Sequence, residues 1–152
     1  MKKAISIAAS LVLCLMIFAG CGAKEANLNE VMDKINSEYQ LSLQTFSSVD
    51  DLNKYYSINT SDVKQFAAEI DSNNDRPIVI IMVEAVDSEA AGNVEKALTN
   101  YYNSIISTYS SYSAENLEMV KSCKVTKDGN FVSLIVASDA QGMLDIYYSF
   151  IK

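Results

Sequence analysis

Apolar side chains recur at helical spacing through three segments of the N-terminal half of the chain. The first segment follows Asn27, and its apolar positions are Leu28, Val31, Met32, Ile35 and Tyr39. The second is short, residues 52–56, and follows Ser48. The third follows Thr60 or Ser61, and its apolar positions are Val63, Phe66, Ala67 and Ile70. Because Asn, Ser and Thr cap helix N-termini, the pattern predicts a helix in each segment.

The C-terminal half alternates strand and helix signals. Residues 78–83 (IVIIMV) form a continuous run of β-formers, which is typical of a strand covered on both faces. Asp87 opens the longest predicted helix, which runs to about Tyr109, and residues 114–120 predict a short helical turn. Asp128-Gly129 then separates two β-rich arms, residues 122–127 and 131–138, as in a hairpin. A last helix is expected after Asp139.

This order predicts an α+β fold, with N-terminal helices followed by β-α-β-β-α. The strands would form a three-stranded, mainly antiparallel sheet packed against helices. The arm at residues 131–138 is apolar on both faces, so we expect it in the centre of the sheet. The long and last helices would cover one face and the N-terminal helices the other.

The first 21 residues have the pattern of a secretory signal. Lys2 and Lys3 precede an apolar run at residues 4–18, which is shorter than the roughly 20 residues of a spanning helix. Ala19-Gly20-Cys21 resembles a bacterial lipobox, in which the cysteine is lipidated, although Phe18 stands where Leu is usual. We therefore expect a signal peptide at residues 1–20, a lipidated tether at 21–27 and a single domain at 28–152. The alternative is an ordinary signal peptide in which Cys21 is incidental.

Charge and composition narrow the functional classes. The 152-residue chain has a net charge of −7, and loss of Lys2 and Lys3 with the signal takes it to −9. Such an acidic domain is not expected to bind nucleic acid, since phosphate contacts need Lys and Arg. Membrane attachment would come from lipid at Cys21, on the extracytoplasmic face. The chain contains no His, the commonest metal ligand and general base, and we expect no cofactor.

Four groups of residues are candidates for a catalytic or metal-binding site. Residues 71–75 (DSNND) copy the start of a calcium loop, but Arg76 and Met82 stand where Gly and Glu are needed, so a polar turn is favoured. Cys123 is expected to be a small buried residue rather than a reactive thiol. The acidic pairs Asp50-Asp51 and Asp87/Glu89 lie at predicted helix starts, where acids are expected. No catalytic or metal-binding residue is therefore assigned.

The nine tyrosines include three adjacent pairs: Tyr55-Tyr56, Tyr101-Tyr102 and Tyr147-Tyr148. One member of each pair should face the core and the other should lie at its rim. A tyrosine-rich rim is found on surfaces that bind protein or glycan, whereas ordinary amphipathic packing gives the same pattern.

Several motifs together resemble the DUF4358 domain, found in lipoproteins and secreted proteins of Clostridia and related Firmicutes. They are residues 52–59 (LNKYYSIN), 62–63 (DV), 78–83 (IVIIMV), 94–98 (VEKAL), 112–116 (YSAEN), 129–132 (GNFV) and 138–140 (SDA). The resemblance spans about residues 28–150, with departures: Ser57 replaces a usual Gly, and Ala114 a usual Pro. The family has no established activity, so the resemblance implies no catalytic residues.

Two functions remain open from the sequence. The first is a non-catalytic envelope lipoprotein whose domain binds a protein partner or a cell-wall component close to the membrane. The alternative is a hydrolase or transferase of the envelope that uses carboxylates. We expect the first, because His, a nucleophile motif and metal-ligand spacing are all missing from the sequence.

Overall fold

The computed structural model describes residues 25–71 and 77–152, so the predicted signal peptide and Cys21 lie outside the described residues. In this part the α-helices are α2 (Leu28–Tyr39), α3 (Val49–Tyr56), α4 (Ser88–Ser110), α5 (Ala114–Ser122) and α6 (Ala140–Ile151). The strands are β1 (Gln44–Thr45), β2 (Val63–Ile70), β3 (Val79–Ala85), β4 (Lys124–Asp128) and β5 (Phe131–Val136). A 3₁₀ turn, η1 (Thr60–Asp62), precedes β2. No helix of the described part is long and apolar enough to cross a membrane.

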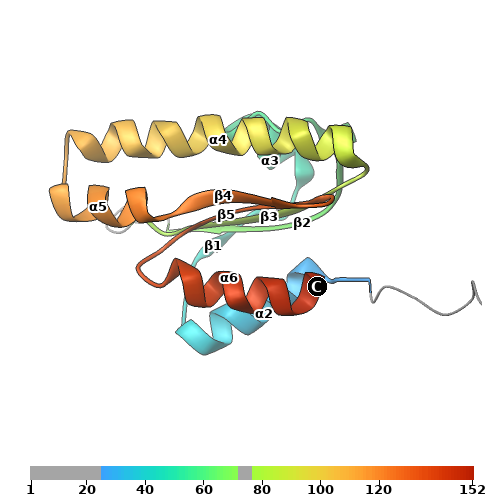
Figure 1. Cartoon of the computed structure of the whole chain (residues 1–152), viewed down its shortest axis with the longest axis horizontal. Helices are drawn as coiled ribbons and strands as arrows, with labels where there is room; N and C mark the ends of the chain where they lie inside the picture. Colours follow the sequence, from blue (N-terminus) through green and yellow to red (C-terminus); the bar gives the residue numbers. More distant parts are fainter. Residues whose placement is uncertain (1–24, 72–76) are drawn as a thin grey trace, which may run out of the picture.

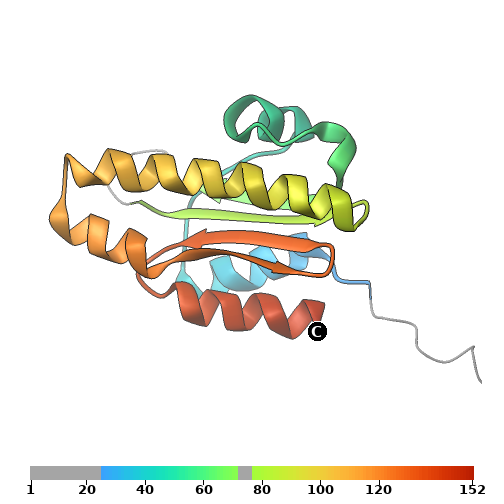
Figure 2. The same ribbon diagram turned by 45° about the horizontal axis from the view of Figure 1, so that its top comes forward.

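The five described strands form one antiparallel sheet in the order β1-β2-β3-β5-β4. Helices cover both faces: α3 and α4 lie on one side, and α2 and α6 on the other (Figure 1). Figure 2 shows α4 running along the strands, with α3 standing beside it near the β1–β2 edge. The molecule is therefore a mixed α/β fold in three layers.

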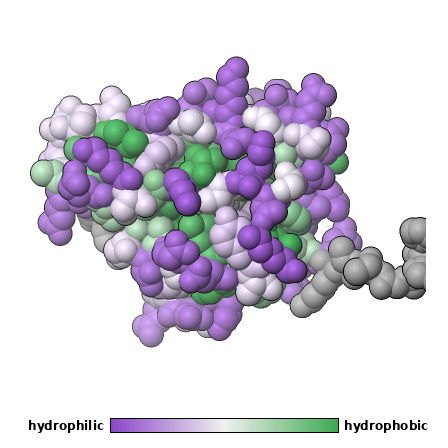
Figure 3. All heavy atoms as spheres, in the orientation of Figure 1, coloured by the Kyte–Doolittle hydropathy of each residue, from purple (hydrophilic) through white to green (hydrophobic). Residues whose placement is uncertain are grey.

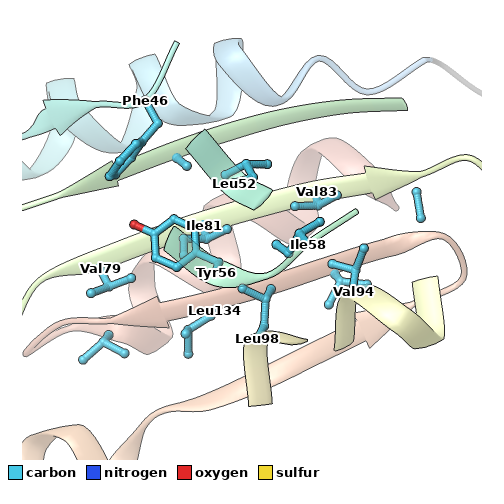
Figure 4. Packing of buried hydrophobic residues seen from close by; sticks show 14 of the residues in the cluster. Phe46, Leu52, Tyr56, Ile58, Val79, Ile81, Val83, Val94, Leu98 and Leu134 are labelled. Carbon is cyan, nitrogen blue, oxygen red and sulfur yellow. The ribbon is translucent and has the colours of Figure 1, made fainter. Parts of the chain in front are cut away.

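Two hydrophobic clusters hold the layers together, one on each face of the sheet. Ile81 packs with Leu52, Tyr56 and Leu98 on the α3–α4 face, whereas Ile80 packs with residues of α2 and α6 on the other face. Both isoleucines are fully buried. Figure 4 shows side chains of α3 and of the turn after it pointing into the same cluster as Val79, Ile81 and Val83. The two-sided burial expected of residues 78–83 is confirmed.

The hairpin and the helix starts also follow the sequence. Gly129, at φ 57°, turns the chain between β4 and β5, and β5 lies between β3 and β4 as predicted. Asn27, Ser48, Asp87 and Asp139 each accept hydrogen bonds from backbone N–H groups in the first turn of the helix that follows.

The helix predicted after Thr60 or Ser61 is wrong, because residues 63–70 form strand β2. A register shift between Val63 and Gln65 and burial on both faces produce the helix-like apolar spacing. Phe66 and Ala68 face the α3–α4 cluster, whereas Ala67 faces the α2–α6 cluster. With β2 and the two-residue β1 added, the described sheet has five strands rather than three.

The predicted assignment of helices to faces is also wrong. The long helix α4 and the last helix α6 cover opposite faces, and the N-terminal helices are divided between them (Figure 1). Apolar periodicity shows that a helix has one buried side, but it does not show which face of the sheet that side covers.

Side chains of β2 hold the first described residues against the sheet. Gln65 donates to the carbonyl of Ala26 at 2.6 Å and accepts from the N–H of Leu28 at 3.1 Å. Lys64 bridges Glu25 at 3.1 Å and Glu84 at 2.8 Å. The chain therefore enters the domain at a fixed place, at the end of the sheet where β2 begins.

Candidate functional site

Three adjoining hollows lie between α3, the turn that follows it, and the exposed side of α4. Their volumes are about 270, 230 and 300 Å³. The first two share Ser57, Ala97 and Asn100, and the last two share Tyr55, Tyr56 and Tyr101, so the hollows are continuous. We name this surface the α3–α4 groove. A further hollow of about 200 Å³ continues from Tyr101 to Tyr109 and ends beside Asp71 and Pro77.

One end of the groove is polar. It is lined by Ser57, Asn59, Asp62, Asn93, Lys96 and Asn100. Asn93 donates to the Asp62 carboxylate at 3.3 Å. Within the described part of the chain, the side chains of Ser57, Asn59, Lys96 and Asn100 have neither a hydrogen-bond nor an ion-pair partner. This end therefore presents hydroxyl, amide and ammonium groups that are open to a ligand.

The backbone turn after α3 positions the polar side chains of Ser57 and Asn59 at this end of the groove. Ser57 ends α3 in the left-handed region, at φ 58°, and its N–H donates to the carbonyl of Asn53 at 3.0 Å. The Asn53 amide donates to the carbonyl of Ile58 at 3.1 Å and fixes the turn. This left-handed conformation favours glycine, and here Ser57 adopts it.

The other end of the groove is aromatic. Phe46 and Tyr56 meet edge to face with ring centroids 5.6 Å apart, and Tyr56 meets Tyr101 at 4.6 Å. Burial raises the pKa of the Tyr56 phenol well above its usual value, and the adjacent Tyr101 adds to the effect. Burial also raises the pKa of Tyr101. Both phenols therefore keep their protons to higher pH than an exposed tyrosine does.

Tyr55 is the exposed aromatic side chain of the groove. Its side chain is 54% exposed, and Lys54 lies over its ring at 4.9 Å from the centroid.

The expectation that one member of each tyrosine pair faces the core is confirmed for Tyr55-Tyr56 and Tyr147-Tyr148. It is wrong for Tyr101-Tyr102, where both are partly buried: Tyr102 donates to the carbonyls of Val120 and Cys123 at 2.9 and 2.8 Å.

The acidic pairs Asp50-Asp51 and Asp87/Glu89 lie at the N-termini of helices, as the sequence predicts. Asp50 and Asp51 lie in the first turn of α3, and Asp87 accepts from the N–H of Ala90 at 2.9 Å. Another hollow, of about 480 Å³, has Glu25 and Glu30 on its rim; both are exposed and already paired, to Lys64 and Asn27. Neither arrangement gathers two free carboxylates around one point.

Cys123 is buried, as expected of a small core residue, and forms no disulfide within the described part of the chain. Its thiol lies 3.3 Å from the carbonyl of Met119.

Of the calcium-loop pattern, only Asp71 is described, and residues 72–75 lie outside the described residues. No three His, Cys, Asp or Glu side chains gather as a metal site among residues 25–71 and 77–152.

The edge strand β4 offers a less suitable surface. Lys124 and Lys127 project from it, and Lys127 pairs with Glu95 of α4 at 2.7 Å. Lysines on an edge strand oppose pairing with another strand. On this face, apolar side chains appear only in patches separated by hydrophilic ones (Figure 3). Of these two described surfaces, the α3–α4 groove is therefore the more suitable for a ligand.

Sequence reasoning did not find the polar end of the groove, because its residues come from two separate segments, 57–62 and 93–100. A signal was present: Asn93, Lys96, Ala97, Asn100, Tyr101 and Ser104 recur along one stripe of α4. The stripe became informative only when α3 was placed beside it.

Comparison with known proteins gives one match. The family model described as "Domain of unknown function (DUF4358)" matches residues 36–137, which include every residue of the α3–α4 groove but leave out most of α2 and all of α6. No curated protein and no solved structure matches the chain. With about two thirds of its length matched, the chain belongs to the DUF4358 family.

Proposed function

We propose that this protein is a lipid-anchored binding module of the bacterial cell envelope, held on the extracytoplasmic face of the membrane through Cys21. Its α3–α4 groove binds an envelope component, and the protein does not catalyse a reaction on it. One observation carries the proposal: four polar side chains that have no partner among residues 25–71 and 77–152 line a groove beside an exposed tyrosine. All four are exposed, so their polar atoms are free to exchange water for a ligand, and a concave surface with a few convergent polar groups favours ligand binding.

The position of the groove is compatible with anchoring. Its polar end begins at Asp62, immediately before β2, and Lys64 and Gln65 of β2 hold the first described residues. The N-terminal segment and the start of α4 lie at the same end of the molecule (Figure 1). Three residues separate Cys21 from Glu25, and the four steps between them span about 14 Å when extended. A lipid at Cys21 would therefore keep this end of the groove close to the membrane.

Anchoring is tested by labelling cells with radioactive palmitate. The wild-type chain should incorporate label, whereas Cys21→Ala should not, because the thiol is the acceptor of the lipid. Cys123→Ala is the matched control and should be labelled like wild type. Equal labelling of Cys21→Ala and wild type would contradict the anchor.

Binding is tested by placing a photoreactive amino acid at single positions of the full chain in living cells. Position 55, in the groove, should give a cross-linked adduct on irradiation. Position 149 is also exposed but lies on α6, on the opposite face of the sheet, and should give none. Absence of an adduct at position 55, or equal adducts at both positions, would contradict a binding role for the groove.

A further inference from the structure

We infer that the α3–α4 groove binds a neutral, N-acetylated oligosaccharide, the glycan strand of the cell wall. The inference rests on the proposed function and names the class of its ligand. It follows from three properties of the groove: its charge, its hydrogen-bonding groups and its exposed ring.

The charge of the groove favours a neutral ligand. Among the described residues that line the three hollows, Asp62 and Lys96 are the ionised side chains, and their charges cancel. One further cation, the ammonium of Lys54, lies beside the groove, 4.9 Å from the centre of the Tyr55 ring. The chain as a whole carries −7, so this balance differs from the rest of the surface. A polyanion would need several cations, and a basic peptide would need several acids.

The hydrogen-bonding groups favour a ligand with hydroxyls and amides. Asn59 and Asn100 each supply a carbonyl acceptor and two N–H donors, and Lys96 supplies three donors. Asn93 supplies its carbonyl and one N–H, because the other N–H donates to Asp62. An acetamido group also combines an N–H donor with a carbonyl acceptor, so it pairs with an asparagine amide on both sides. Sugar hydroxyls donate and accept, which suits the mixture of Asp62, Lys96 and Ser57.

The exposed ring favours a ligand that also has an apolar face. Tyr55 adjoins the polar groups through Ser57 and Asn100, which line the same hollow. One side of a pyranose ring presents C–H groups, which pack on an aromatic ring while the hydroxyls at the ring edge stay hydrogen-bonded. A chain of such sugars would lie along α4, with one unit on Tyr55 and the next among the asparagines.

The test is calorimetric titration of the full chain, purified in detergent, with N-acetylglucosamine tetrasaccharide. We expect saturable binding, and binding at least about tenfold weaker for the glucose tetrasaccharide of the same linkage, which lacks acetamido groups. Equal binding of the two sugars would overturn the acetamido part of the inference. No binding of the N-acetylated sugar at millimolar concentration would overturn it entirely.

Matched variants locate the binding. Tyr55→Ala and Asn100→Ala should each weaken binding by about tenfold or more, the loss of one stacking contact or one hydrogen-bonded amide. Tyr112→Ala and Asn103→Ala remove an exposed tyrosine and an exposed asparagine outside the groove and should bind like wild type. Equal weakening in all four would place the sugar elsewhere and contradict the inference.

The photo-cross-linking result separates failure of this inference from failure of the proposed function. An adduct at position 55 that muramidase digestion converts to small fragments supports a glycan. An adduct with a protein, together with no sugar binding, would overturn the inference and leave the binding module in place. No adduct and no sugar binding would overturn both.

Discussion

Tyr56 and Tyr147 should control how the stability of the domain changes in alkaline solution. Burial raises the pKa of both phenols above the ordinary value of about 10. The unfolded chain therefore releases these protons at lower pH than the folded chain does. The stabilisation is fully present below about pH 10 and is lost as the pH rises toward the folded-state values. We expect a loss of roughly 1 kcal/mol per tyrosine at about pH 11.

The measurement is a series of urea melts between about pH 8 and pH 11. Tyr56→Phe and Tyr147→Phe should each flatten the alkaline decrease of the unfolding free energy. Tyr112→Phe is the control, because Tyr112 is 82% exposed, and should keep the wild-type slope. Slopes that are the same in all four proteins would show that neither phenol is protected by the fold.

Within single elements, substitution of two glycines by alanine should change the free energy of unfolding in opposite directions, although both glycines have equal space around them. A Cβ atom at Gly129 or at Gly92 would meet no atom within 4 Å. Gly129 has φ 57° in the β4–β5 turn, so Gly129→Ala should cost about 1 kcal/mol. Gly92 lies inside α4, so Gly92→Ala should add about 0.5–1 kcal/mol. Thermal melts that shift in the same direction would contradict the assigned backbone conformations.

The strand β3 should depend equally on its two faces. Ile80→Ala and Ile81→Ala each remove a fully buried side chain, one from each hydrophobic cluster, and each should cost about 2–5 kcal/mol. Val86→Ala, just after β3 and 51% exposed, should change stability by less than about 0.5 kcal/mol. Denaturant melts of chains that begin at Ala23 provide the comparison. An unchanged midpoint for either isoleucine variant would mean that one face of the sheet is uncovered.

Elements with a strong local signal could be predicted from the sequence, and elements defined by distant contacts could not. The run at residues 78–83, the Asp128-Gly129 turn and the capping residues each carry their own signal. β2 was misread because burial on two faces and a register shift gave apolar residues at 63, 66, 67 and 70. The two residues of β1 are too few to form a pattern. The groove required knowing that α3 packs beside α4, which no local pattern encodes.

In the molecule as a whole, the two sides of the sheet differ in what covers them and in what they leave accessible. On one side, α2 and α6 cover the sheet, and β2 holds the segment that leads to the predicted anchor. On the other side, α3 and α4 cover it and leave the groove between them. The match to the DUF4358 family contains the groove and omits most of the α2–α6 layer. We propose that binding occurs on the α3–α4 side.

The most direct test of this claim is to map amide chemical shifts in the isotope-labelled chain that begins at Ala23, during titration with N-acetylglucosamine tetrasaccharide. We expect shift changes concentrated in residues 55–62 and 93–104, on the two walls of the groove, and none in α6. Shifts concentrated in α2, α6 or the β4 edge, or no shifts at saturating sugar, would contradict it.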